Sequence, residues 1–309
     1  MKLSIVSPVY RAEKIVPVLV EGIANAASKV TMDYEIILVD DGSPDGSWKA
    51  IEGVCEVNGH VTGVKLSRNF GQHPAIFAGL EQASGDWVVV MDCDMQDDPK
   101  AIEPLYKLAE QGGCDKVLVK RYIREDGRLK MMFSSLFYRV YSYLTNTKTD
   151  GSVANYGIYS RKVIDAVLQL KDKNKAFPLM VNWVGFEAKQ IEVKHQRRYE
   201  GESTYNWRKL FALATDIAFS FSQKPILLTV RIGILTSLIA FIYGAVVLFQ
   251  YVSGDIEVLG YTSLIVSIWF LSGLIIFCLG IVGSYVARIF EGVKDRPVFI
   301  ISKLRGKTK

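Results

Sequence analysis

The first 122 residues alternate between short apolar runs and segments in which apolar residues recur at helical spacing. The apolar runs are nearly continuous, which is typical of strands buried on both faces of a sheet. Strand runs that alternate with helical segments predict an α/β fold, with a mostly parallel sheet covered by helices on both faces. The predicted strands are 2–10, 34–43, 61–67, 86–94 and 115–121, and the predicted helices are 13–28, 43–59, 73–84 and 100–113.

Polar residues gather where these predicted strands end. In parallel sheets ligands bind beyond the carboxyl ends of the strands, so this edge is the expected site. No G-x-G-x-x-G follows the first strand and no G-x-x-x-x-G-K-[ST] occurs anywhere, which argues against dinucleotide oxidoreductases and P-loop NTPases. The residues at the strand ends are Pro8 and Tyr10, Asp40 and Asp41, Asp92 and Asp94, and Lys120 and Arg121.

The pattern changes after about residue 127. Residues 129–146 mix aromatic residues, methionine and basic residues at helical spacing. They fit either a core helix or a helix in the membrane interface, where Tyr and Phe sit at headgroup level. Residues 207–227 look similar and lead directly into the long apolar part of the chain, so we expect a juxtamembrane amphipathic helix there.

Two uncharged segments, 232–252 and 259–287, each exceed the roughly 20 residues needed to span a bilayer. The loop between them is acidic and the outer flanks are basic, so the positive-inside rule puts both termini in the cytoplasm. We therefore expect a multi-pass protein of the inner (plasma) membrane; a buried helical hairpin in a soluble protein is the alternative. The expected parts are a cytoplasmic domain (1–206), the juxtamembrane helix, two spans within 228–287 and a basic tail (288–309).

Composition supports the membrane assignment. Half of the residues are apolar, and 37 Lys and Arg outnumber 32 Asp and Glu, giving a net charge of +5. The basic residues cluster beside the apolar segments without forming a long run, so a membrane surface is favoured over nucleic acid. The four cysteines are widely spaced and form no C-x-x-C pair, which indicates reduced thiols rather than disulfides or a zinc site.

In the segment "VVVMDCDMQDDP" (88–99), a predicted strand is followed by a cluster of acidic residues. Carboxylates with a neutral amide oxygen suit a hard cation such as Mg²⁺ or Mn²⁺, which commonly bridges to phosphates. On an extended chain Asp92, Asp94 and Gln96 alternate, so their side chains are expected to share one side. A solvated acidic turn is the alternative, and Asp97 and Asp98 fit a turn and a helix cap before Pro99.

Five segments, in order, carry a resemblance: "SPVYRAE", "VDDGS", "RNFGQHPAIFAGL", "MDCDMQDDP" and "RRYEGESTY", ahead of two hydrophobic spans. Together they resemble the family 2 glycosyltransferases that act on polyprenyl phosphates, such as dolichyl-phosphate mannose synthases and bacterial undecaprenyl-phosphate glucosyl- and aminoarabinosyl-transferases. The resemblance implies a GT-A-like Rossmann-type fold and inverting transfer of a sugar from a nucleotide sugar to a polyprenyl phosphate, with Mg²⁺ or Mn²⁺ as cofactor.

The resemblance also implies roles for individual residues. Asp92, Asp94 and Gln96 match the metal and pyrophosphate motif. The incoming lipid phosphate is already ionised, so the enzyme mainly aligns the substrates and neutralises charge. The other matching positions are Pro8, Tyr10, Glu13, Asp40, Arg68 and Asn69 for the donor, Arg121, Lys130, Ser134 and Arg198 for the acceptor phosphate, and Gly201, Ser203 and Tyr205 in a loop over the site.

One region departs from the family pattern. Where many members carry Asp-x-Gly-Asp-Phe-Arg-Leu, this chain has Ser152, Asn155 and Gly157 in place of the two Asp and the Arg. A catalytic Asp is therefore not transferred to this region, and the sugar is not identified. A processive polysaccharide synthase and a non-catalytic membrane-anchored protein are the alternatives, although extra spans and a Gln-x-x-Arg-Trp motif are missing and the metal acids are intact. Two spans also leave room for homo-oligomers.

Overall fold

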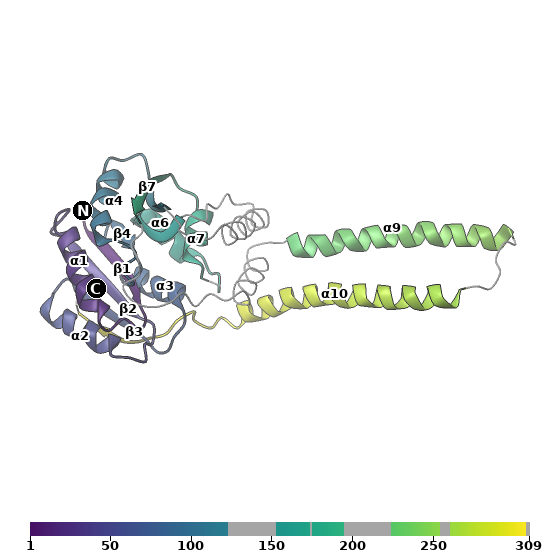
Figure 1. Cartoon of the computed structure of the whole chain (residues 1–309), viewed down its shortest axis with the longest axis horizontal. Coiled ribbons are helices and arrows are strands. Elements are labelled where there is room, and N and C mark those ends of the chain that lie inside the picture. The colour runs from purple at the N-terminus through teal and green to yellow at the C-terminus, as the bar shows by residue number, and fades with distance from the viewer. Residues whose placement is uncertain (123–152, 174, 195–223, 254–259, 307–309) are drawn as a thin grey trace. The chain divides into compact units, whose positions relative to one another are not determined.

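A computed structural model describes residues 1–122, 153–173, 175–194, 224–253 and 260–306 (Figure 1). The chain divides into two compact units. One is an α/β unit that contains the described residues up to Lys194 together with those from Arg296 onward. The other contains two long helices, and each unit is described by itself. The predicted interfacial helices, 128–146 and most of 207–227, lie outside the described residues.

The α/β unit is built on one eight-stranded sheet in the order β7-β5-β6-β4-β1-β2-β3-β8. β1 is central and pairs in parallel with β2 and β4, while β6 and β8 run antiparallel to their neighbours. The predicted mostly parallel sheet is therefore confirmed. The strands are β1 (Leu3–Val9), β2 (Tyr34–Asp40), β3 (Val61–Leu66), β4 (Trp87–Val90), β5 (Lys116–Tyr122), β6 (Val153–Ser160), β7 (Ala188–Lys194) and β8 (Ile301–Arg305).

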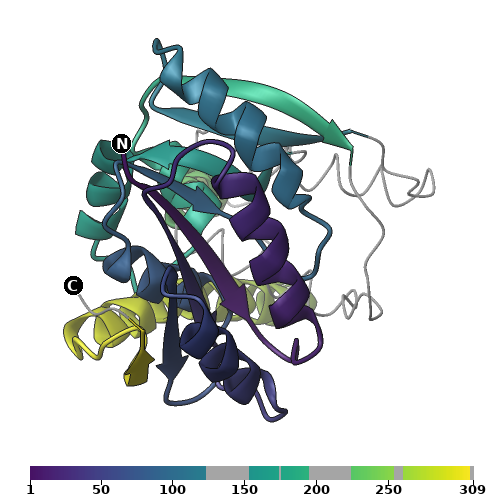
Figure 2. The same cartoon turned by 90° about the vertical axis from the view of Figure 1, so that its left-hand side faces the viewer.

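Helices cover both faces of this sheet (Figures 1 and 2). Successive side chains of a strand point to opposite faces, so Ile5 joins the core beneath α1, α2 and α4, and Val6 joins the core beneath α3, α6 and α7. These two cores explain why the strand runs are apolar throughout. The helices are α1 (Ile15–Ala27), α2 (Ser47–Val57), α3 (Gln72–Gln82), the 3₁₀ turn η1 (Pro99–Ala101), α4 (Ile102–Glu110), α6 (Arg161–Gln169) and α7 (Phe177–Trp183).

The fourth strand is shorter than the sequence predicted. β4 ends at Val90, and the chain then turns, with Met95 in the left-handed region at φ 60°. The buried carboxylate of Asp97 accepts a hydrogen bond from the amide of Asp92 (3.1 Å), which closes the turn. The expectation that the acids alternate along an extended chain is therefore wrong, because this local bond takes the backbone out of the sheet.

The chain returns to the sheet after the second long helix. β8 pairs with the outer edge of β3, and the amide of Ser67 donates to the carbonyl of Ile300 at 2.9 Å. Phe299 and Ile301 pack against the core beneath α3. The sequence indicated only a basic tail here, whereas residues 301–305 form an edge strand of the sheet.

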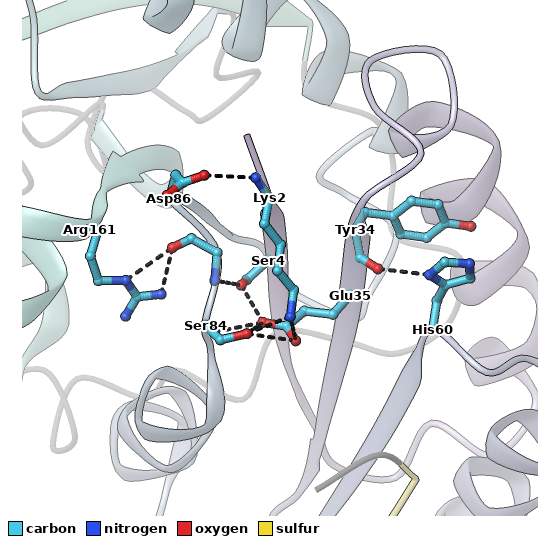
Figure 3. A network of polar contacts seen from close by, with 9 residues as sticks. Lys2, Ser4, Tyr34, Glu35, His60, Ser84, Asp86 and Arg161 are labelled. Atoms are coloured by element: carbon cyan, nitrogen blue, oxygen red, sulfur yellow. Dashed lines mark hydrogen bonds and ion pairs between the residues drawn. The ribbon is translucent and has the colours of Figure 1, made fainter. Parts of the chain in front are cut away.

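A polar network joins the amino-terminal ends of β1, β2 and β4, at the opposite edge from the expected site (Figure 3). Glu35 accepts hydrogen bonds from Ser4 Oγ (2.6 Å) and the amide of Ser84 (2.7 Å), and pairs with Lys2 Nζ (2.8 Å). Burial alone would raise the pKa of Glu35, but these bonds outweigh burial and hold its pKa below the ordinary value. The network thus ties three strands together through one ionised carboxylate.

The helical unit consists of α9 (Lys224–Ser253) and α10 (Tyr261–Val293). Windows within them, 226–243 and 267–293, have mean hydropathies of 2.1 and 2.2 and are long enough to cross a membrane. Almost none of their residues are buried; Phe241 and Trp269, for example, are each 77% exposed. A buried hairpin would hide such side chains from solvent, so their exposure favours lipid as the surrounding medium.

Candidate active site at the carboxyl edge of the sheet

Asp40, the last residue of β2, is fully buried at the carboxyl edge of the sheet. Its Oδ1 accepts a hydrogen bond from the amide of Ser43 (3.1 Å). Its Oδ2 is also buried and has no hydrogen-bond partner among the residues that the structure describes. A buried polar oxygen without a partner is costly, and such a group in a native structure calls for a functional explanation.

The loop after β1 carries the other residues expected near the donor. Pro8 lies in β1 beyond its last pairing with β4, at Val6, so the missing proline amide costs no hydrogen bond on that side. Tyr10 is 42% exposed, with the Arg11 guanidinium 5.4 Å from its ring centroid. Glu13 accepts a hydrogen bond from the amide of Gly46 (3.2 Å), which joins this loop to the turn after β2.

Arg68 and Asn69 lie on the loop after β3, and Asp41 fixes that loop. Asp41 accepts hydrogen bonds from the amides of Phe70 (2.7 Å) and Gly71 (2.9 Å). Burial raises the pKa of Asp41 despite these two bonds, which lower it. The exposed Arg68 guanidinium stacks 4.2 Å from the centroid of the Phe70 ring. The arrangement holds the backbone of Arg68 and Asn69 against Gly42, two residues after the buried Asp40.

The acidic turn after β4 contains two kinds of carboxylate. Asp97 and Asp98 are structural: Asp97 closes the turn, and Asp98 caps η1 by accepting from the amide of Lys100 (3.0 Å), as the sequence predicted. Asp92 and Asp94 are half-buried. Asp94 Oδ1 accepts a hydrogen bond from the amide of Gln96 (3.1 Å), so backbone geometry orients its carboxylate.

Asp92 is bound by a side chain from a different element. Gln72 is the first residue of α3, and its side-chain Nε2 donates a hydrogen bond to Asp92 Oδ1 at 2.6 Å. The thiol between the two acids is not a candidate nucleophile, because burial raises the pKa of Cys93 to about 12. The chemistry of this turn therefore rests on oxygen ligands.

The donor set suits a cation that brings some of its own ligands. No group of three or more His, Cys, Asp or Glu side chains converges among the residues that the structure describes. Asp92 and Asp94 supply two carboxylates, which is the number that Mg²⁺ commonly takes from a protein when substrate phosphates complete its coordination. The residues present therefore fit a metal held jointly with a diphosphate.

The acceptor residues are only partly within the described chain. Arg121 lies near the carboxyl end of β5, where its backbone pairs with Val193 of β7. Gly157, in the region that departs from the family pattern, lies in β6, where a Cβ would stand 2.8 Å from the carbonyl of Val117. A larger side chain does not fit there without a shift of the strand. Lys130, Ser134, Arg198, Gly201, Ser203 and Tyr205 lie outside the described residues.

The structure adds Asp41 and Gln72 to the predicted site. Asp41 follows Asp40 in "VDDGS", so its position at a strand end was visible in the sequence. Its role as the clamp of the Arg68 loop was not, because that contact joins positions 29 and 30 residues apart. Gln72 lies in the segment "RNFGQHPAIFAGL" and directly before the predicted helix 73–84, but neither observation gave it a role.

Comparison with known proteins identifies the family. The family model described as "Glycosyl transferase family 2" matches residues 4–168, which is more than half of the chain. This chain belongs to glycosyl transferase family 2. The SfII prophage-derived bactoprenol glucosyl transferase of Shigella flexneri is 35% identical over 306 residues, covering 98% of each chain. The undecaprenyl-phosphate 4-deoxy-4-formamido-L-arabinose transferase of Proteus mirabilis (strain HI4320) is 32% identical over 315 residues, covering 100% of this chain and 95% of that protein.

Solved structures show the same fold at lower identity. The crystal structure of a mycobacterial protein superposes with a TM-score of 0.50 and 16% identity, over 71% of this chain and 73% of that one. Such a likeness supports the fold alone. With the family match, it confirms the GT-A-like architecture that the sequence resemblance implied.

Proposed function

We propose that this protein transfers a sugar from a nucleotide-sugar donor to the phosphate of a polyprenyl phosphate, with inversion at the anomeric carbon. Relatives that match over nearly their whole length are named for bactoprenol and undecaprenyl phosphate. Two helices of membrane-spanning length fit an acceptor that resides in a bilayer. The basic flanks of these helices support a site on the cytoplasmic side.

The observation that carries the proposal is the buried carboxylate of Asp40, whose Oδ2 has no hydrogen-bond partner in the part of the chain that the structure describes. In the proposed complex this oxygen accepts a hydrogen bond from the base or ribose of the donor. Arg68 and Asn69 lie near the donor, and Asp92 and Asp94 face its diphosphate. A divalent cation bound there would neutralise the charge that develops on the leaving diphosphate.

The acceptor is activated by position rather than by a base. A phosphate oxygen is already ionised at neutral pH, so binding must mainly align it with the anomeric carbon. We assign this task to Arg121, Lys130 and Arg198, with Ser134 beside Lys130, by analogy with the family. The lipid oxygen forms the new glycosidic bond as the bond from the sugar to the diphosphate breaks, so no covalent glycosyl-enzyme is required.

The test is a screen of nucleotide sugars with undecaprenyl phosphate and Mn²⁺, with lipid-linked product detected by mass spectrometry. Asp94→Ala is expected to abolish transfer by the protein, because it removes one of two carboxylates that face the diphosphate. Glu103→Ala is the matched control, since this acid is partly exposed and pairs with Lys107 (2.7 Å) one helical turn away. Undiminished transfer by Asp94→Ala would refute the metal assignment, and failure of every nucleotide sugar would refute the reaction.

A further inference from the structure

Gln72 connects two loops that come from different parts of the sheet. Its side chain extends from the start of α3, which packs on β1 and β2. Its Nε2 donates to Oδ1 of Asp92, in the turn after β4, at 2.6 Å. The bond therefore links α3, which follows the loop that contains Arg68, to Asp92 in the turn after β4.

Both ends of this bond are held by the fold. The backbone before Gln72 is fixed because Asp41 accepts from the amides of Phe70 and Gly71, and Gly71 adopts φ 102°. The amide of Asp92 donates to the buried carboxylate of Asp97. The Gln72 side chain itself is exposed, so it contributes little to the core and can be replaced without opening a cavity.

We propose that Gln72 is a positioning residue for the proposed metal site: its amide orients the Asp92 carboxylate toward the cation and the donor diphosphate. This inference rests on the proposed function. A neutral amide suits the task because it fixes the carboxylate by a hydrogen bond and leaves its negative charge for the cation. A cationic donor at the same place would compete with the metal for that charge. Partners that hold ligating carboxylates typically contribute about 10–100-fold in metal affinity or activity.

The experiment compares Gln72→Met with the wild type in the full-length, detergent-solubilised protein. Methionine matches glutamine in length but lacks the donor, so the fold is retained while the bond is lost. Free Mn²⁺ is measured by electron paramagnetic resonance during titration with protein in the presence of UDP and, separately, of GDP, because a diphosphate completes the proposed metal site. The Mn²⁺ bound by each nucleotide alone is subtracted. We expect roughly 10-fold weaker Mn²⁺ binding or more, and a matching rise in the Mn²⁺ concentration that half-activates transfer.

Two further variants separate the possible outcomes. Gln82 lies at the other end of the same helix, so the Gln82→Met variant is expected to bind Mn²⁺ like the wild type. Asp94→Ala is expected to lose Mn²⁺ binding. Unchanged Mn²⁺ binding by Gln72→Met, with binding lost in Asp94→Ala, would overturn the role of Gln72 alone. Unchanged binding in both, or no Mn²⁺ binding by the wild type, would overturn the metal site itself. A lower thermal midpoint of Gln72→Met with unchanged Mn²⁺ affinity would show a merely structural role.

Discussion

Replacing Glu35 by glutamine tests whether one carboxylate joins the amino-terminal ends of three strands. The amide oxygen of glutamine can still accept from Ser4 and Ser84, but each bond then has a neutral acceptor and weakens by about 1 kcal/mol. The ion pair with Lys2, at 2.8 Å, is lost, which adds up to about 1 kcal/mol for a partly exposed pair. These losses sum to at most about 3 kcal/mol, and glutamine relieves the cost of burying a charge, so the expected net cost is about 1–2 kcal/mol of unfolding free energy.

The thermal midpoint of the detergent-solubilised protein, followed by tryptophan fluorescence, measures this cost. A loss of about 1–2 kcal/mol in a domain of about 150–250 residues corresponds to a fall of roughly 2–8 °C. Glu52→Gln is the control, because Glu52 pairs with the exposed Arg305 at 3.4 Å, and such surface pairs contribute about 0–1 kcal/mol. Equal midpoints for the two variants would refute the proposed role of the network.

The pH dependence of the Glu35→Gln effect provides a second check. The folded pKa of Glu35 lies below its ordinary value of 4.5. The carboxylate therefore stabilises the fold fully above about pH 4.5, and this contribution is lost as the pH falls through the folded pKa. The glutamine side chain of the variant does not titrate, so the difference in midpoint between wild type and variant should hold from about pH 7 to about pH 5 and narrow below. A difference that stays constant down to about pH 3 would contradict the assignment.

Three glycine substitutions test the packing behind and beside the site. Gly79→Ala in α3 should lower the thermal midpoint by an amount equivalent to about 1–3 kcal/mol, because the new Cβ would meet Val6 and stand 3.0 Å from Val39. Gly53→Ala in α2, where no atom lies within 4 Å, should instead raise it by up to about 1 kcal/mol; a stabilising Gly79→Ala would contradict the packing. Gly42→Ala should raise the KM for the nucleotide sugar, since Gly42 has φ 64° and its Cβ would stand 2.6 Å from the amide of Asn69. An unchanged KM would show that the Arg68 loop tolerates this shift.

Sequence pattern predicted the central strands and helices well because both faces of the sheet are buried. Runs such as 36–39 are apolar at every position, and the residues that follow them lie at one edge by topology alone. Asp40 and Asp92 were therefore found as site candidates without knowledge of the fold. Their position at this edge of the sheet follows from the direction of the parallel strands, not from a particular side-chain contact.

Features that depend on long-range contacts or on single side chains were not predicted. β4 was extended to residue 94 because the turn depends on the side chain of Asp97, which the apolar pattern does not report. β8 was missed because Ile301–Arg305 is short and mostly exposed, so its pattern indicates a solvated tail. The Gln72–Asp92 bond joins side chains 20 residues apart, and only the packing of α3 on the sheet brings them together.

The pairing of β8 with β3 has a consequence for how the protein is made. Lys65 and Ser302 are 237 residues apart, and both membrane-length helices lie between them in the chain. At typical rates of synthesis β3 waits roughly 10–50 s for this partner, with its outer edge open to pairing with other chains. Both membrane-length helices are thus synthesised before the sheet can be completed. A shortened version for crystallography should keep residues 296–306, because truncation before α9 would leave the edge of β3 uncovered.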